Sequence, residues 1–151
     1  MGQTFQEKVA AIAGGARLRM VDWVTLASIV QKEAPNAESA PIIAAVFKNR
    51  LKVGMPLDSD ATVRYALNHA VPGGLSLGDL TVSSPYNTYL HPGLPPGPIC
   101  NPGLSSLTAA LHPATVPYLY FLTLRNGRVL YATTYAEHLA NIAWANQHGG
   151  E

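Results

Sequence analysis

One acidic residue occupies a position where the helical pattern calls for an apolar one. Glu33 follows Val30 by three residues and Ile29 by four, so it lies on the apolar face of a predicted helix. Carboxylates are seldom placed on a buried face without a partner or a role. Burial and the partial negative charge at a helix C-terminus both raise the pKa of such a group. A carboxylic acid that keeps its proton near neutral pH is suited to act as a general acid in glycosidic bond cleavage.

Periodicity leaves a second interpretation of Glu33 open, namely a residue at the edge of the core that is paired with Lys or Arg. A glycoside hydrolase normally needs another carboxylate about 5–9.5 Å away. The candidates each have a local explanation: Asp58 and Asp60 as caps of a short helix, Asp79 in a capping box, and Glu137 in the first turn of the last helix. No partner for Glu33 stands out, which favours a reaction that uses a single carboxylate.

The elements that must position this residue follow from apolar periodicity, caps and turn residues. They are a weak helix over 4–13, a helix from Asp22 as N-cap to Glu33, helices over 40–53 and 61–67, a single turn at 76–79, a loop over 83–103, a helix over 104–111, strands over 118–124 and 128–131 around Asn126-Gly127, and a helix over 135–146. This order predicts a single α+β domain over residues 1–151, mostly helical, with a β-hairpin and a long ordered loop rich in Pro, Gly and Tyr.

The composition excludes several classes of protein. Of the 151 residues, 48% are apolar and 13% are charged, and the formal net charge is +1, too little basic charge for a nucleic-acid groove. No stretch approaches the ~20 continuous apolar residues of a membrane-spanning helix, and the first residues lack the pattern of a signal peptide. The single cysteine, Cys100, and the unpaired spacing of the five histidines predict no disulfide, no metal site and no cofactor.

Some polar residues have two interpretations. Residues 74–78 match G-x-S-x-G, but a loop precedes them, so a capping box of Ser76 is favoured over a catalytic serine. Asn49 lies on a helix face with apolar neighbours, where it either reaches a cleft or caps a loop carbonyl. Arg50 is interpreted as structural, and His138 as a surface position on the last helix.

Several segments then match one family in order. Residues 26–34, Leu-Ala-Ser-Ile-Val-Gln-Lys-Glu-Ala, resemble the catalytic motif of the MltG/YceG-like family of endolytic murein transglycosylases. Further blocks lie at 46–57, 58–65, 84–103, 109–114 and 118–121, and the segment at 84–103 contains Y-N-T-Y and G-L-P-P-G-P-I. The resemblance covers about residues 24–143. One departure is Ala61, where relatives often have Pro, and it concerns only the local turn.

The resemblance implies a reaction and a site. Members of this family cut glycan strands of peptidoglycan internally, between N-acetylmuramic acid and N-acetylglucosamine, and leave 1,6-anhydromuramic ends. Glu33 is implied as the acid and then the base. The expected substrate-binding residues are Tyr86, Asn87, Thr88, Tyr89, Asn49 and Thr62. Hydroxyls, an amide and aromatic faces suit sugar rings, although each tyrosine also has the ordinary interpretation of packing a loop onto the core.

Two other functions stay open at this point. One is a muramidase-type hydrolase, and the other is an inactive glycan-binding scaffold, against which the presence of Glu33 argues. The resemblance also implies peptidoglycan strands and the cell-wall synthesis machinery as partners, without nucleic acid. It implies work at the outer face of the bacterial cytoplasmic membrane, with the N-terminal anchor and LysM-like domain of relatives outside these residues.

Overall fold

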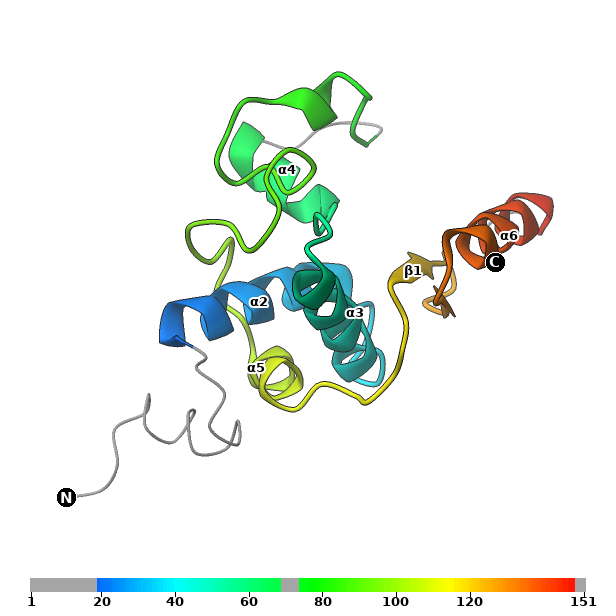
Figure 1. Ribbon diagram of the computed structural model, residues 1–151, viewed down its shortest axis with the longest axis horizontal. Helices are drawn as coiled ribbons and strands as arrows, with labels where there is room; N and C mark the ends of the chain where they lie inside the picture. Colours follow the sequence, from blue (N-terminus) through cyan, green and yellow to red (C-terminus); the bar gives the residue numbers. More distant parts are fainter. Residues whose placement is uncertain (1–18, 69–73, 149–151) are drawn as a thin grey trace.

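The computed structural model describes residues 19–68 and 74–148 (Figure 1). The predicted helix over 4–13 lies outside these ranges. The elements are α2 (Met20–Glu33), α3 (Ala40–Val53), α4 (Asp60–Leu67), the 3₁₀ turn η1 (Asp79–Thr81), α5 (Leu104–Leu111), β1 (Tyr120–Thr123), β2 (Val129–Ala132) and α6 (Tyr135–Gln147). The predicted α+β class, with mostly helices and one hairpin, is confirmed. No described helix is long and apolar enough to cross a membrane.

Helix α2 carries the acidic residue at its last position. The prediction that Asp22 is its N-cap is wrong: the N-cap lies three residues earlier, at Arg19, the helix begins at Met20, and Asp22 lies in the first turn. Aspartate is favourable both as an N-cap and in the first turn of a helix, so its presence alone does not decide between the two positions. Ala34 is extended at the end of the helix, as expected of a residue that precedes proline.

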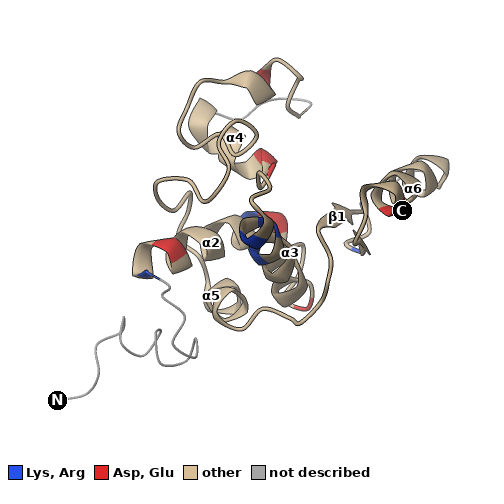
Figure 2. Ribbon diagram, viewed as in Figure 1, with Lys and Arg blue, Asp and Glu red and all other residues tan. Residues whose placement is uncertain are grey.

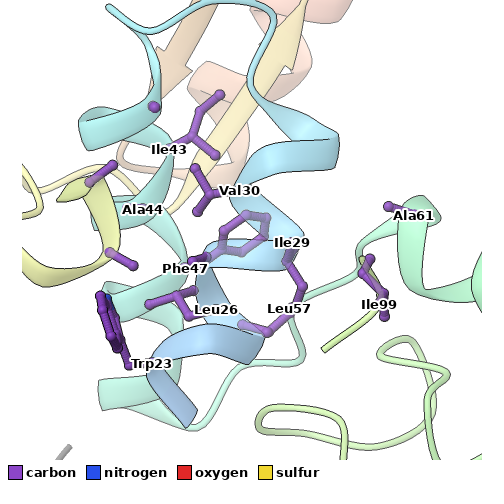
Figure 3. Close-up of a cluster of buried hydrophobic side chains, with 14 residues drawn as sticks. Trp23, Leu26, Ile29, Val30, Ile43, Ala44, Phe47, Leu57, Ala61 and Ile99 are labelled. Atoms are coloured by element: carbon purple, nitrogen blue, oxygen red, sulfur yellow. The ribbon is translucent and has the colours of Figure 1, made fainter. Parts of the chain in front are cut away.

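The core lies between α2, α3 and α5 (Figure 3). Ile29, Val30 and Phe47 are among its most fully buried side chains. The indole Nε1–H of Trp23 donates to the Leu107 carbonyl oxygen at 2.9 Å, which ties the start of α2 to α5. Helix α3 has Pro41 in its first turn and is capped after Val53 by Gly54, whose φ of +76° favours glycine. This packing fixes the end of α2 in space.

The long loop is held by buried hydrogen bonds rather than by regular structure. No helix or strand occurs between η1 and α5, as predicted for residues 83–103. The Ile99 backbone N–H donates to the Ser28 Oγ at 3.0 Å, so the loop is attached to α2. Before it, Ser76 and Asp79 form the predicted capping box, in which each backbone N–H donates to the other side chain. Ser76 is therefore a capping residue at a single turn.

The hairpin and α6 form a second group of elements, drawn to one side of the helices in Figure 1. Strands β1 and β2 pair antiparallel, with Tyr120 opposite Ala132 and Thr123 opposite Val129. Gly127 has a φ of +86° in the predicted turn. Helix α6 begins with a capping box of Thr134 and Glu137, which confirms Glu137 in the first turn.

Candidate active site

Glu33 lines a pocket of about 460 Å³ between the two groups of elements. The other lining residues are Arg50, Leu57, Asp58, Asp60, Tyr89, Tyr120, Phe121, Leu122, Thr123, Tyr135 and His138. One wall comes from α2, α3, the residues before α4 and the long loop. The opposite wall comes from β1 and α6. Glu33, the last residue of α2, thus borders the free volume of this pocket.

Burial of the Glu33 side chain raises the pKa of its carboxyl group above the ordinary value. Hydrogen bonds from the Ser59 hydroxyl, at 3.0 Å to Oε1, and from the Ala61 backbone N–H act in the opposite direction. The negative charge of Asp60 raises the pKa further, and the positive charge of Arg64 lowers it. Burial is the largest of these effects, so the carboxyl keeps its proton to a higher pH than an exposed glutamate does.

The second interpretation of Glu33, as a core-edge residue paired with a cation, does not fit this geometry. Within the described ranges the ion pair found is Arg50 with Asp58, at 3.7 Å, and Glu33 forms none. Its hydrogen-bond donors are a hydroxyl and a backbone amide. A half-buried carboxyl without a cation at contact distance is the arrangement that a proton donor requires.

Two further carboxylates lie in the same pocket, which corrects the expectation that Glu33 stands alone. Asp58 and Asp60 were predicted to cap α4, but the N-cap is Ser59 and no side chain caps the helix. Asp60 instead accepts a hydrogen bond from the Tyr89 hydroxyl, and Asp58 pairs with Arg50. Figure 2 shows this acidic segment at the start of α4 near the basic residues of α3. The pocket therefore brings together three carboxyl groups and one guanidinium.

The Y-N-T-Y segment divides into buried and accessible residues. Asn87 and Thr88 are 0% and 1% exposed. The Asn87 Nδ2 donates to the carbonyl oxygens of Leu80 and Val82, both at 2.9 Å. The Thr88 Oγ1 accepts from the Ser59 N–H at 2.9 Å. The structure therefore does not support the predicted substrate contacts of Asn87 and Thr88, because both side chains are buried and hydrogen-bonded within the protein.

Thr62 and the half-buried Asn49 also use their side chains for hydrogen bonds within the protein. Thr62 is fully buried, and its hydroxyl donates to the Ser59 carbonyl oxygen at 2.7 Å. The Asn49 Nδ2 donates to the carbonyl oxygens of Val116 and Tyr118, both at 2.9 Å, which is the capping role that the sequence left open. Neither residue lines the pocket that contains Glu33. Both hold the backbone of the walls in place.

The two tyrosines of the segment are partly accessible and face different places. Tyr89 lines the Glu33 pocket. Tyr86 packs its ring against Tyr65 of α4, with centroids 4.8 Å apart. The buried pair Asn87-Thr88 between them fixes the loop beneath α4. Of the six predicted substrate-binding residues, the structure thus places one in the Glu33 pocket and one beside α4.

Arg50 connects the two walls. Its Nε donates to the Leu119 carbonyl oxygen at 2.6 Å, and its Nη1 donates to the carbonyl oxygens of Pro56 and Leu57. The guanidinium also lies over the ring of Tyr120, 5.1 Å from its centroid. These contacts agree with the structural role predicted for Arg50, although the side chain also lines the pocket.

Sequence reasoning missed the hairpin wall. Tyr120 lines the pocket and stacks on His138, with ring centroids 5.0 Å apart. His138 was predicted at the surface, yet it lines the pocket, and its Nδ1 is buried without a hydrogen-bond partner in the part of the chain that the structure describes. Burial and the charge of Arg50 lower its pKa. Tyr118, Tyr120 and His138 are aromatic residues of the kind that bind sugars, and this was the signal in the sequence. Only the fold shows that Tyr120 and His138 line the same pocket as Glu33.

The donor set indicates acid–base chemistry. Among residues 19–68 and 74–148, no group of three or more His, Cys, Asp and Glu side chains is arranged to hold a metal ion. What the pocket offers is a carboxyl group whose pKa is raised by burial, two further carboxylates and aromatic rings. Aromatic faces with a few convergent polar groups are typical of small-ligand and sugar sites.

Comparison with known proteins gives consistent results. The YceG-like family matches residues 1–144. The endolytic murein transglycosylase of Bacillus subtilis strain 168 is 49% identical over 115 residues, which make up 76% of this chain and 32% of that protein. The protein of the same name from Streptococcus pneumoniae is 35% identical over 132 residues, 83% of this chain and 24% of the relative.

A solved structure agrees with these matches. The crystal structure of a YceG-like protein from Listeria monocytogenes has a TM-score of 0.80 at 41% identity, and the match covers 88% of this chain and 42% of that chain. This chain therefore spans a third or less of the two sequence relatives and under half of the crystallised one. Because the family match extends over nearly the whole sequence and the fold agrees, this chain belongs to the YceG-like family.

Proposed function

We propose that this chain is the catalytic part of an endolytic lytic transglycosylase of peptidoglycan, with Glu33 as its acid and base. The single observation that carries the proposal is the half-buried Glu33 carboxyl, whose pKa is raised and which faces an open pocket. The names of the relatives, endolytic murein transglycosylase, support the reaction class. As implied by the family, the substrate is the glycan strand, and the site of action is the outer face of the cytoplasmic membrane.

The reaction needs no water. The protonated Glu33 carboxyl donates its proton to the oxygen that bridges C1 of N-acetylmuramic acid and C4 of N-acetylglucosamine, and the bond from C1 to that oxygen breaks. The C6 hydroxyl of the same muramic residue then closes on C1, and its proton passes to the Glu33 carboxylate. The products are a 1,6-anhydromuramic end and a free N-acetylglucosamine end, and Glu33 is again protonated. A raised pKa suits both steps of this cycle.

Asp58 and Asp60 have a part in this proposal. Positive charge develops at C1 in the transition state, and fixed negative groups stabilise it. Asp60 is oriented by the Tyr89 hydroxyl, and Asp58 by the Arg50 guanidinium. Their presence in the pocket is also the observation that favours the alternative function, a hydrolase in which one of them activates water.

Product analysis separates these possibilities. Purified peptidoglycan is digested with the parent chain and with the Glu33→Gln, Asp58→Asn and Asp60→Asn variants, and the products are identified by mass spectrometry. The proposal expects anhydromuropeptides from the parent, none from Glu33→Gln, and reduced amounts of the same products from the two Asn variants. Reducing muramic ends that disappear in one Asn variant would establish the hydrolase instead. An absence of any product from the folded parent would contradict both.

The Glu33→Gln variant is a suitable control because we expect it to fold as the parent does. The Gln Oε1 accepts the Ser59 hydrogen bond as Glu33 does. The folded state raises the pKa of Glu33, so the stability that this group contributes is complete below its unfolded pKa and is lost as the pH rises through the folded pKa. Glutamine does not ionise. Near neutral pH, the variant is therefore expected to unfold at no lower urea concentration than the parent.

A further inference from the structure

A second pocket, of about 320 Å³, is lined by residues next in sequence to two of those that line the Glu33 pocket. Its lining residues are Lys32, Ala61, Arg64, Tyr65, Asn68 and Ile99. Sequence neighbours line the two pockets at two places. Lys32 and Ala61 line the second pocket, whereas their sequence neighbours Glu33 and Asp60 line the Glu33 pocket. Both pockets therefore reach the end of α2 and the start of α4.

The charge of this second pocket is opposite to that of the first. Lys32 and Arg64 are both exposed, and neither forms an ion pair within residues 19–68 and 74–148. Among the residues that the structure describes, no carboxylate lines the pocket. By contrast, three carboxyl groups and one guanidinium line the Glu33 pocket. Two cations that share a concave site without an acidic partner form a site for an anion.

The rest of the pocket is suited to an organic anion. Ala61 and Ile99 are buried and form an apolar surface. The ring of Tyr65, which is 44% exposed, packs against Tyr86 and so is held in place. Arg64 lies near enough to Glu33 for its charge to lower the pKa of that carboxyl. A ligand with an apolar portion and a carboxylate would therefore be bound close to the proton donor.

We propose that this pocket, the Lys32–Arg64 pocket, binds a carboxylate carried by the C3 side group of a muramic residue near the cleaved bond. The inference rests on the proposed function. That side group is a lactyl ether, which is either free as a carboxylate or extended by a peptide with carboxylates of its own. The apolar surface of Ala61 and Ile99 contacts the aliphatic part, and the two cations bind the anionic end. Substrate selection thus depends on the substituent as well as on the sugar.

Binding is measured by calorimetry in chains that also carry Glu33→Gln. These chains do not cut the strands, and Arg64 cannot act through the titration of a carboxyl at position 33. The probes are soluble peptidoglycan strands with peptides, the same strands after amidase treatment, which leaves free lactyl carboxylates, and chitohexaose, which has no carboxylate. The test variants are Lys32→Gln and Arg64→Gln. Arg125→Gln is the matched control, because Arg125 is exposed and lines none of the pockets described above.

Each test variant is expected to weaken binding of a carboxylate-bearing strand about tenfold, as for the loss of one charge-assisted hydrogen bond. Chitohexaose binding is unchanged, and Arg125→Gln has no effect. Weaker binding of the peptide-bearing strand alone assigns the anion to the peptide, and an effect on the amidase-treated strand assigns it to the lactyl group. Three outcomes would overturn the proposal. The variants could bind chitohexaose as much more weakly as they bind the charged strands, they could bind both charged strands with unaltered affinity, or the chain with Lys32 and Arg64 intact could fail to bind the charged strands.

A separate measurement distinguishes this failure from failure of the proposed function. With Glu33 intact, anhydromuropeptides formed by Lys32→Gln and Arg64→Gln at an unchanged KM would leave the transglycosylase function standing and reject the Lys32–Arg64 pocket. Reducing ends from the parent chain would reject the function itself, whatever the affinities. A raised KM with anhydro products retained supports both.

Discussion

Replacing Asn87 tests whether the Y-N-T-Y segment binds sugar through its amide or supports the site from below. The side chain is 0% exposed and makes three hydrogen bonds to the backbone. Nδ2 donates to the carbonyl oxygens of Leu80 and Val82, both at 2.9 Å, and Oδ1 accepts from the Tyr89 N–H at 3.0 Å. At about 1 kcal/mol for each bond, Asn87→Ala is expected to lower the free energy of unfolding by about 3 kcal/mol.

Asn87→Asp sharpens the test because it keeps the shape of the side chain. It retains the acceptor for the Tyr89 N–H but replaces two donated hydrogen bonds with a carboxylate oxygen that faces two carbonyl oxygens. A buried charge without a partner is costly, so this variant is expected to lose at least as much stability as Asn87→Ala. Asn146→Ala is the control, since Asn146 is exposed on α6.

Urea unfolding followed by circular dichroism gives the free energies, with the slope of the transition compared among variants. Glycan affinity is then measured in conditions where each variant is fully folded. The structural interpretation expects a large loss of stability and an affinity close to that of the parent. A change in unfolding free energy below about 1 kcal/mol, together with lost affinity of the folded chain, would refute the reasoning.

Three further outcomes follow from the structure. A general acid must be protonated, so kcat/KM falls as the pH rises through the pKa of Glu33. Because Asp60 raises this pKa and Arg64 lowers it, Asp60→Asn should move the fall in kcat/KM to lower pH and Arg64→Gln should move it to higher pH. Shifts in the same direction in the two pH–rate profiles would contradict the assignment. Phe47→Ala removes a core ring that is 1% exposed and should reduce the unfolding free energy by about 3–5 kcal/mol in urea titrations. Gly127→Ala places a side chain at a φ of +86° and should cost about 1 kcal/mol by thermal unfolding, whereas an unchanged midpoint would argue against this turn.

The helical part of the fold and the position of Glu33 could be predicted because both depend on local pattern. An apolar stripe with a carboxyl in it is visible in a window of eight residues, and proline after Ala34 marks the end of the helix. Asp58 and Asp60 could not be assigned to the pocket in the same way. A cap and a pocket residue have the same sequence context, and only the turn before α4 and the contact with Tyr89 decide between them.

The amide residues show the converse limit. Asn87 and Asn49 have the chemistry of sugar-binding residues, but the structure uses their amides to satisfy loop carbonyls. A long loop without regular structure leaves many backbone groups to be hydrogen-bonded, and buried side-chain amides commonly meet that need. The wall of Tyr120 and His138 lies about ninety residues or more from Glu33 in the sequence, and no local pattern predicts such a pairing.

Arg50 has a consequence for how this pocket tolerates sequence change. One guanidinium serves carbonyl oxygens before α4 and before β1, a carboxylate and an aromatic ring. Lysine cannot reproduce this, because a single ammonium lacks the planar fork of donors. The free-energy effects of two distant substitutions, one on each wall, should therefore be additive, unless both substituted residues contact Arg50. In a mutational library, we expect epistasis between the hairpin and the start of α4 to be concentrated at this one residue.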